Sequence, residues 1–173
     1  GFRRLSIIDI KNGQQPMSSK NKNFIICFNG EIYNYKKIQK MLNDEGVLLK
    51  TSSDTEVLLE AFVLWGEKCL KIINGMFSFV IYDKLQKKIY LVRDRFGMKP
   101  LFYSNEGNQL LFSSEIKGIL SSNLIEKNIN ENAVSSYLTF RYPYGVGTFF
   151  KNIHSLEPGQ IIEIDKNQNI LIK

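Results

Sequence analysis

Histidine, cysteine and long apolar runs are scarce in this 173-residue chain, and each shortage argues against a class of function. One histidine and two cysteines, with no ligand spacing among them and the carboxylates, give no metal site. A Gly-rich phosphate loop of the Walker type is missing as well. No segment approaches the roughly 20 apolar residues of a membrane helix, and no signal-peptide pattern opens the chain. We therefore expect no membrane partner.

The two cysteines indicate a reducing compartment. Cys27 lies in an apolar run and Cys69 in a helical pattern, and both are expected to be buried, inert thiols. Such cysteines suit a cytoplasmic protein better than a secreted one.

Positive charge exceeds negative charge, but it is not concentrated. The formal net charge is +6, with basic pairs such as Lys36-Lys37 and Lys87-Lys88 and no basic run interleaved with aromatic residues. We therefore expect no nucleic-acid partner.

The length and the 43% hydrophobic content fit one globular domain. Apolar periodicity predicts helices over 35–45, 54–64, 115–120 and 131–138, with a further helical turn over 67–73. It predicts strands over 24–28, 76–82, 89–92, 101–103, 110–112, 160–164 and 170–172. Helices grouped with antiparallel strands indicate an α+β fold.

A polar turn follows the buried strand at 24–28. Asn29 and Gly30 offer a side-chain amide and a backbone N–H, two donors that can point at one oxygen as an oxyanion hole requires. Taken alone, Asn-Gly is more commonly an ordinary turn dipeptide. Other residues must decide between the two interpretations.

Two charged residues are candidates for binding a small ligand. Arg4 stands at an expected strand end, and its planar fork of donors suits a carboxylate, although a surface arginine is the plain alternative. Asp54 opens a helix that Ser53 is expected to cap, in a capping box with Glu56. Asp54 could then accept from an ammonium group, or simply stabilise the helix dipole.

Four blocks carry a resemblance to a known family. They are Arg3-Arg4-Leu5-Ser6-Ile7-Ile8-Asp9, Asn29-Gly30-Glu31-Ile32-Tyr33-Asn34, Ser53-Asp54-Thr55-Glu56 and Arg93-Asp94-Arg95-Phe96-Gly97-Met98-Lys99-Pro100-Leu101. In this order they closely resemble the N-terminal glutaminase domain of glutamine-hydrolysing asparagine synthetases, which are class II glutamine amidotransferases. The resemblance extends from Gly1 to about Gly159. It implies the N-terminal nucleophile (Ntn) hydrolase sandwich, four layers α/β/β/α with two antiparallel sheets.

The resemblance also implies a role for each matching residue. Arg4 would bind the α-carboxylate of glutamine, Asp54 its α-amino group, and Glu31 would be a second contact at the amino end. Asn29 and Gly30 would form the oxyanion hole. The backbone of Leu5, Ser6, Ile7 and Ile8 would line the same pocket.

The nucleophile of the family is an N-terminal cysteine that is not among these residues. Its free α-amine, with a pKa of about 7.7 to 8.0, would act as the base. We therefore expect a fragment that lacks the start of the domain and has no glutaminase activity by itself. Neither Cys27 nor Cys69 nor the lone His154 is expected to replace it. The block from Arg93 to Leu101 is expected to be a salt-bridged loop without a catalytic role.

By resemblance, residues 1–165 are a class II glutamine amidotransferase domain and 166–173 lead toward a C-terminal synthetase domain. Glutamine would be hydrolysed to glutamate and ammonia, and a tunnel would carry ammonia to that second domain, which converts aspartate to asparagine. ATP and magnesium would act there, and no cofactor is expected in this part; a homodimer is left open. A related amidotransferase with another acceptor, for example in polysaccharide synthesis, is one alternative. A non-catalytic binding or assembly module of the same fold is the other.

Overall fold

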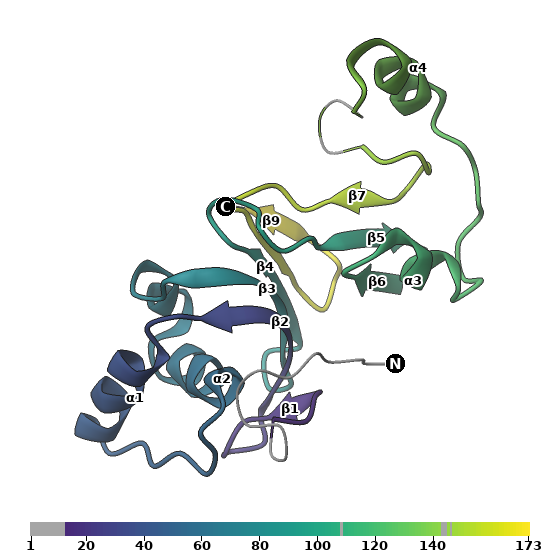
Figure 1. Ribbon diagram of the computed structural model, residues 1–173. Coiled ribbons are helices and arrows are strands. Elements are labelled where there is room, and N and C mark those ends of the chain that lie inside the picture. The colour runs from purple at the N-terminus through teal and green to yellow at the C-terminus, as the bar shows by residue number, and fades with distance from the viewer. Residues whose placement is uncertain (1–12, 108, 143–144, 146) are drawn as a thin grey trace.

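The computed structural model describes residues 13–107, 109–142, 145 and 147–173, and its strands form two antiparallel sheets (Figure 1). The larger sheet has the order β1-β2-β3-β4-β8-β9 and the smaller has the order β6-β5-β7. The strands of the larger sheet are β1 (Met17–Ser18), β2 (Phe24–Ile32), β3 (Gly75–Asp83), β4 (Lys88–Arg93), β8 (Ile161–Ile164) and β9 (Ile170–Ile172). Those of the smaller sheet are β5 (Phe102–Glu106), β6 (Gln109–Ser113) and β7 (His154–Ser155). The helices are α1 (Tyr35–Asp44), α2 (Asp54–Trp65), the 3-10 helix η1 (Gly66–Lys71), α3 (Ile116–Leu120) and α4 (Glu131–Phe140).

Alternation along β3 divides the interior into two cores. Phe77, Phe79 and Ile81 pack with α1 and α2 on one side of the large sheet. Val80, which points the other way, packs with Leu101 of the segment that leads into the small sheet. Because α3 packs against β5 and β6, the order of layers is helix, sheet, sheet, helix.

Helix α2 is more enclosed than an amphipathic helix would be. Its first nine residues are all buried, whereas an amphipathic helix would bury one apolar stripe only. Two buried glutamates in this stretch have hydrogen-bond donors. Glu60 Oε1 accepts from the Lys20 N–H at 2.7 Å, and Glu56 accepts from the backbone N–H groups of Lys50 and Thr51.

The expected capping box is wrong. Ser53 does cap α2, since its side chain accepts from the Thr55 N–H. However, the Ser53 N–H donates to Thr51 Oγ1, and Glu56 is used to hold the preceding loop. Glu56 therefore stabilises the contact between α2 and the preceding loop, and it does not cap the helix.

Most predicted elements are confirmed within a few residues at their ends. Strands β1 and β7, two residues each, were too short for a periodicity to predict them. Strands β5 and β6 are longer than predicted, so their connecting turn is tighter.

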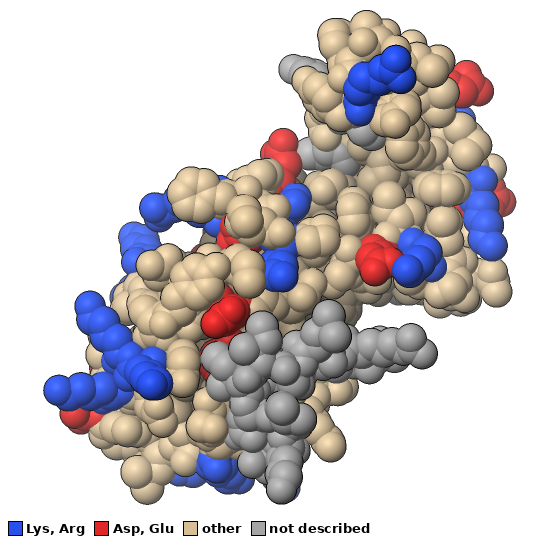
Figure 2. Space-filling view, viewed as in Figure 1, with Lys and Arg blue, Asp and Glu red and all other residues tan. Residues whose placement is uncertain are grey.

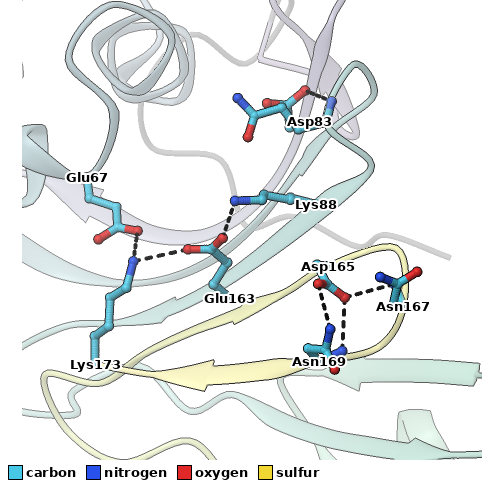
Figure 3. A network of polar contacts seen from close by, with 9 residues as sticks. Glu67, Asp83, Lys88, Glu163, Asp165, Asn167, Asn169 and Lys173 are labelled. Carbon is cyan, nitrogen blue, oxygen red and sulfur yellow. Dashed lines mark hydrogen bonds and ion pairs between the residues drawn. The ribbon is translucent and has the colours of Figure 1, made fainter.

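The last strand is fixed to the sheet and to the helical layer. The backbone of Lys173 exchanges two hydrogen bonds with Ile161, at 2.9 and 3.0 Å. Its ammonium group bridges Glu67 of η1 and Glu163 of β8, and Glu163 also pairs with Lys88 of β4 (Figure 3). Partly exposed ion pairs are individually weak, but this network joins three strands and a helix.

The basic side chains lie in separate groups on the visible face rather than in one continuous stripe (Figure 2). One group comes from α1, where Lys36, Lys37 and Lys40 are exposed. In the part of the chain that the structure describes, no helix is long and apolar enough to cross a bilayer.

Candidate active site

The Asn-Gly motif lies within β2 and near its end, so the predicted polar turn after residue 28 is wrong: the strand continues to Ile32. Asn29, Gly30 and Glu31 pair in register with Ser78, Phe77 and Met76 of β3. Their neighbours Phe28 and Ile32 are buried against the helical layer. By alternation, Asn29 and Glu31 belong to the opposite face, the one turned toward the small sheet.

No other residue can replace Gly30 unless the strands of the sheet move apart. A Cβ at this position would lie 2.2 Å from the carbonyl oxygen of Met76 and 2.7 Å from Phe77 Cα. Its φ of 152° also falls where side chains are rarely tolerated. The glycine therefore fixes a close approach of β2 and β3 next to Asn29.

Asp54 is brought to the strand that carries Asn29. Its carboxylate is buried, with 3% of the residue exposed, and Oδ2 accepts from the Ile32 N–H at 3.1 Å. The carboxylate also lies in the first turn of α2, where the helix dipole stabilises negative charge. Two segments separated in sequence thus place Asp54, Asn29, Gly30 and Glu31 at one end of the sheet.

The remaining predicted site residues, Arg4 and the backbone of Leu5, Ser6, Ile7 and Ile8, lie outside the described residues. Their roles stay predictions, and so do the ligand contacts assigned to Asn29, Gly30, Glu31 and Asp54.

Ser114 is a part of this region that sequence reasoning missed. Asn29 Nδ2 donates to Ser114 Oγ at 3.2 Å, and Ser114 is its one side-chain partner among the described residues. Ser114 follows β6, so this bond ties the large sheet to the segment after the small one. No sequence signal relates two residues that are 85 positions apart.

The loop after β4 is held by the carboxylate of Asp94. This carboxylate is 1% exposed and accepts from the N–H groups of Phe77, Phe96, Met98 and Lys99 at 3.0 to 3.2 Å. Burial alone would raise the pKa of Asp94, but these four hydrogen bonds outweigh it and hold the pKa below its usual value.

Arg93 holds the same loop from the other side. Its guanidinium donates to the carbonyl oxygens of Lys99, Gly97 and Leu156. Burial lowers the pKa of Arg93. The expected salt-bridged loop is wrong. Within the described residues Arg93 binds carbonyl groups and Ser155 Oγ, Asp94 binds backbone N–H groups, and no ion pair joins the charges of this loop.

The two cysteines are unpaired thiols. Burial raises the pKa of Cys69 to about 12 and raises that of Cys27 as well, although Cys27 is only half-buried. Neither thiol is therefore activated at neutral pH. His154 lies in β7 with its ring centroid 5.5 Å from that of Tyr103, a packing contact.

Two surface hollows of about 510 and 350 Å³ lie against the helical layer, and Trp65 lines both. Neither is lined by Asn29, Gly30, Glu31 or Asp54. We base the candidate site on the convergence of polar residues at the end of β2.

The chain is similar in sequence to known proteins. The sequence pattern of the glutamine amidotransferase domain family matches residues 1–173. "Asparagine synthetase [glutamine-hydrolyzing] 1" of Bacillus subtilis is 39% identical over 100% of this chain, which corresponds to 27% of that protein. Number 3 of the same organism is 36% identical over 96% of this chain and 28% of that protein. The chain thus spans little more than a quarter of the length of these relatives.

Solved structures agree in fold. Glutamine phosphoribosylpyrophosphate amidotransferase from B. subtilis superposes with a TM-score of 0.60 at 19% identity, over 92% of this chain and 31% of that one. A glutamine aminotransferase class-II domain protein from Silicibacter pomeroyi gives 0.52 at 14% identity, over 88% of this chain and 67% of that one. The predicted α+β sandwich of the Ntn hydrolases is confirmed. The chain belongs to the glutamine amidotransferase domain family.

Proposed function

We propose that this chain is the glutamine-hydrolysing half of an asparagine synthetase. The observation that carries the proposal is the match of nearly the whole chain to proteins named as glutamine-hydrolysing asparagine synthetases. The meeting of Asp54 and the Asn29-Gly30 segment at one end of the sheet supports it.

The residues at this end would hold glutamine for attack at its side-chain carboxamide. Asp54 would receive the α-ammonium group, with Glu31 beside it, and Arg4 would pair with the α-carboxylate through two parallel hydrogen bonds. The backbone of the segment from Leu5 to Ile8 would line the pocket.

The chemistry follows from what Asn29 and Gly30 can donate. A thiolate attacks the carboxamide carbon, the C=O electrons move to oxygen, and the Asn29 amide and the Gly30 N–H stabilise the resulting oxyanion. Collapse of this intermediate expels ammonia with a proton and leaves a thioester, which water hydrolyses to glutamate. By family resemblance the thiolate belongs to an N-terminal cysteine, which is not among these 173 residues.

The rest of the proposal concerns the longer protein. Ammonia would pass to a synthetase part that amidates aspartate, and ATP and magnesium would act there. Relatives more than three times as long as this chain support such a part. A cytoplasmic location belongs to the proposal and is supported by the two unpaired cysteines. An amidotransferase with another acceptor is less favoured, because these relatives are named asparagine synthetases.

The substitution Asp54→Asn in the complete protein tests the substrate site. Asparagine keeps an oxygen that can accept from the Ile32 N–H but loses the charge that would pair with an ammonium group. We expect KM for glutamine to rise roughly tenfold or more, since a charged hydrogen bond contributes about 1.5 to 3 kcal/mol. The steady-state rate of glutamate release at a series of glutamine concentrations gives this KM.

Asp83→Asn is the matched control, because Asp83 is equally buried but lies at the opposite end of β3. It should leave KM unchanged, and both variants should keep synthesis from free ammonia. If Asp54→Asn lowers glutamine-dependent and ammonia-dependent synthesis equally, Asp54 supports the fold and not the substrate.

A further inference from the structure

Phe96 and Met98 are unusually exposed for apolar side chains on a loop whose backbone is hydrogen-bonded. They are 79% and 64% exposed. Their own backbone N–H groups both donate to Asp94 Oδ1 at 3.0 Å. The loop thus presents two large apolar side chains on a fixed backbone, which is a common property of interaction surfaces.

The last strand ends beside this loop. The Asp94 carbonyl accepts from the Gly159 N–H at 2.8 Å, and the Arg93 N–H donates to the Gln160 carbonyl. The next residue, Ile161, is the backbone partner of Lys173. Because the side chain of Lys173 is also held by Glu67 and Glu163, the direction of the chain at this point is fixed (Figure 3).

We propose that Phe96 and Met98 form the docking surface for the synthetase part that follows this domain in the longer relatives. The inference rests on the proposed function, since it needs that part to be present. A sequence continuing from Lys173 would emerge next to the loop, so the surface is within reach of the first structure that follows. A loop already held in place loses little conformational entropy on binding, which favours a stable contact.

The surface also predicts the chemistry of its partner. Arg95, which directly precedes Phe96 in the chain, is exposed as well. A complementary surface would offer an apolar pocket for Phe96 and Met98, with a carboxylate at its rim for Arg95.

Helix α4 is the main rival surface. Leu138 and Phe140 are 74% and 57% exposed, and the helix stands apart from the sheets in Figure 1. Nothing among the described residues shows what covers it, whereas the loop lies beside the end of the last strand.

Hydroxyl-radical footprinting of the complete protein tests the proposal without depending on catalysis. Labelling of Phe96 and Met98 should be roughly tenfold lower than their exposure here implies, because interface cores are packed like protein interiors. Phe140 and Leu85, which are 57% and 72% exposed, are the controls and should be labelled in full. Full labelling of Phe96 and Met98 would overturn the proposal. Protection of Phe140 in their place would move the interface to α4, and protection that vanishes on dilution would assign it to a second copy of the chain.

The double substitution Phe96→Ser with Met98→Ser adds a functional measurement. In the complete protein it should leave the rate of glutamate release unchanged and raise the ratio of glutamate released to asparagine formed. Leu138→Ser with Phe140→Ser is the matched control and should leave the ratio unchanged. An unchanged ratio in the loop variant contradicts docking there. A wild-type protein that releases no glutamate contradicts the proposed function, while the footprint still decides the docking surface.

Discussion

The two ends of the large sheet are held together in different ways. At the end where the hairpins turn, the two turns are closed by bonds between near neighbours, and Lys84 adds two longer bonds, to the carbonyl groups of Lys22 and Asn23. Asp83 Oδ1 accepts from the N–H groups of Leu85 and Gln86, and Asp165 Oδ1 accepts from those of Asn167 and Asn169 (Figure 3). Turns of this kind form from neighbouring residues and need little from the rest of the fold.

At the end that carries the candidate site, several bonds join distant segments. The Ile32–Asp54 bond spans 22 residues, the bond from Arg93 to the Leu156 carbonyl spans 63, and the Asn29–Ser114 bond spans 85. The site therefore exists only when several layers are packed together. Substitutions at the site end should therefore lower the free energy of unfolding more than matched substitutions elsewhere.

The largest effect is expected for Gly30→Ala. The new Cβ would meet the Met76 carbonyl at 2.2 Å on a backbone with positive φ, so β2 and β3 must separate. We expect a loss of about 4 kcal/mol in the free energy of unfolding. Urea denaturation measures it. Gly46→Ala is the control, since Gly46 also has positive φ but no atom within 4 Å of its Cβ position. It should lose only about 1 kcal/mol, and equal losses would contradict the account.

Asp94→Asn should have the next largest effect. Asparagine has one acceptor oxygen where the carboxylate oxygens serve four N–H donors. We expect the free energy of unfolding to fall by about 3 kcal/mol. Asp83→Asn, at the local end, keeps the acceptor that its turn uses and should lose less than about 0.5 kcal/mol.

The stability of the protein should depend on the charge of Asp94. Its pKa in the folded state is lowered, so its contribution is present above the pKa of an unfolded aspartate, about 3.9, and is lost as pH falls through the folded value. Urea midpoints should therefore fall more steeply below about pH 4 in the wild type than in Asp94→Asn. Parallel curves would mean that the carboxylate is not held in its ionised form.

Ser114→Ala should have the smallest effect, and it tests how Asn29 is oriented. Removing one neutral hydrogen bond of 3.2 Å is expected to lower kcat for glutamine about fivefold, with KM unchanged. Ser114→Thr keeps the hydroxyl and should restore the rate. A rise in KM, or no rescue by threonine, would mean that Ser114 does not orient the amide.

The difference between the two ends also explains what the sequence could predict. Helix α2 and its cap at Ser53 follow from neighbouring residues, and the hairpin turns follow from their Asp, Asn and Gly residues. Asn29 and Asp54 could be selected because they lie in recognisable motifs. The residues that form hydrogen bonds with these motifs could not be predicted from the sequence.

The errors have the same origin. Glu56 fits a capping box by spacing, yet in the folded protein its carboxylate accepts from the backbone N–H groups of Lys50 and Thr51. Asp94 and Arg93 look like an ion pair in sequence, yet each binds backbone groups of a folded loop. Ser114 carries no local signal at all. Bonds between distant segments depend on the assembled sheets, which no short motif specifies.

The central claim is that the end of β2 stabilises an oxyanion derived from glutamine, and Asn29→Ala in the complete protein tests it most directly. We expect kcat for glutamine hydrolysis to fall by about 10² to 10³, with KM little changed and synthesis from free ammonia retained. A raised KM with an unaltered kcat, or an equal loss with both nitrogen sources, would contradict the account.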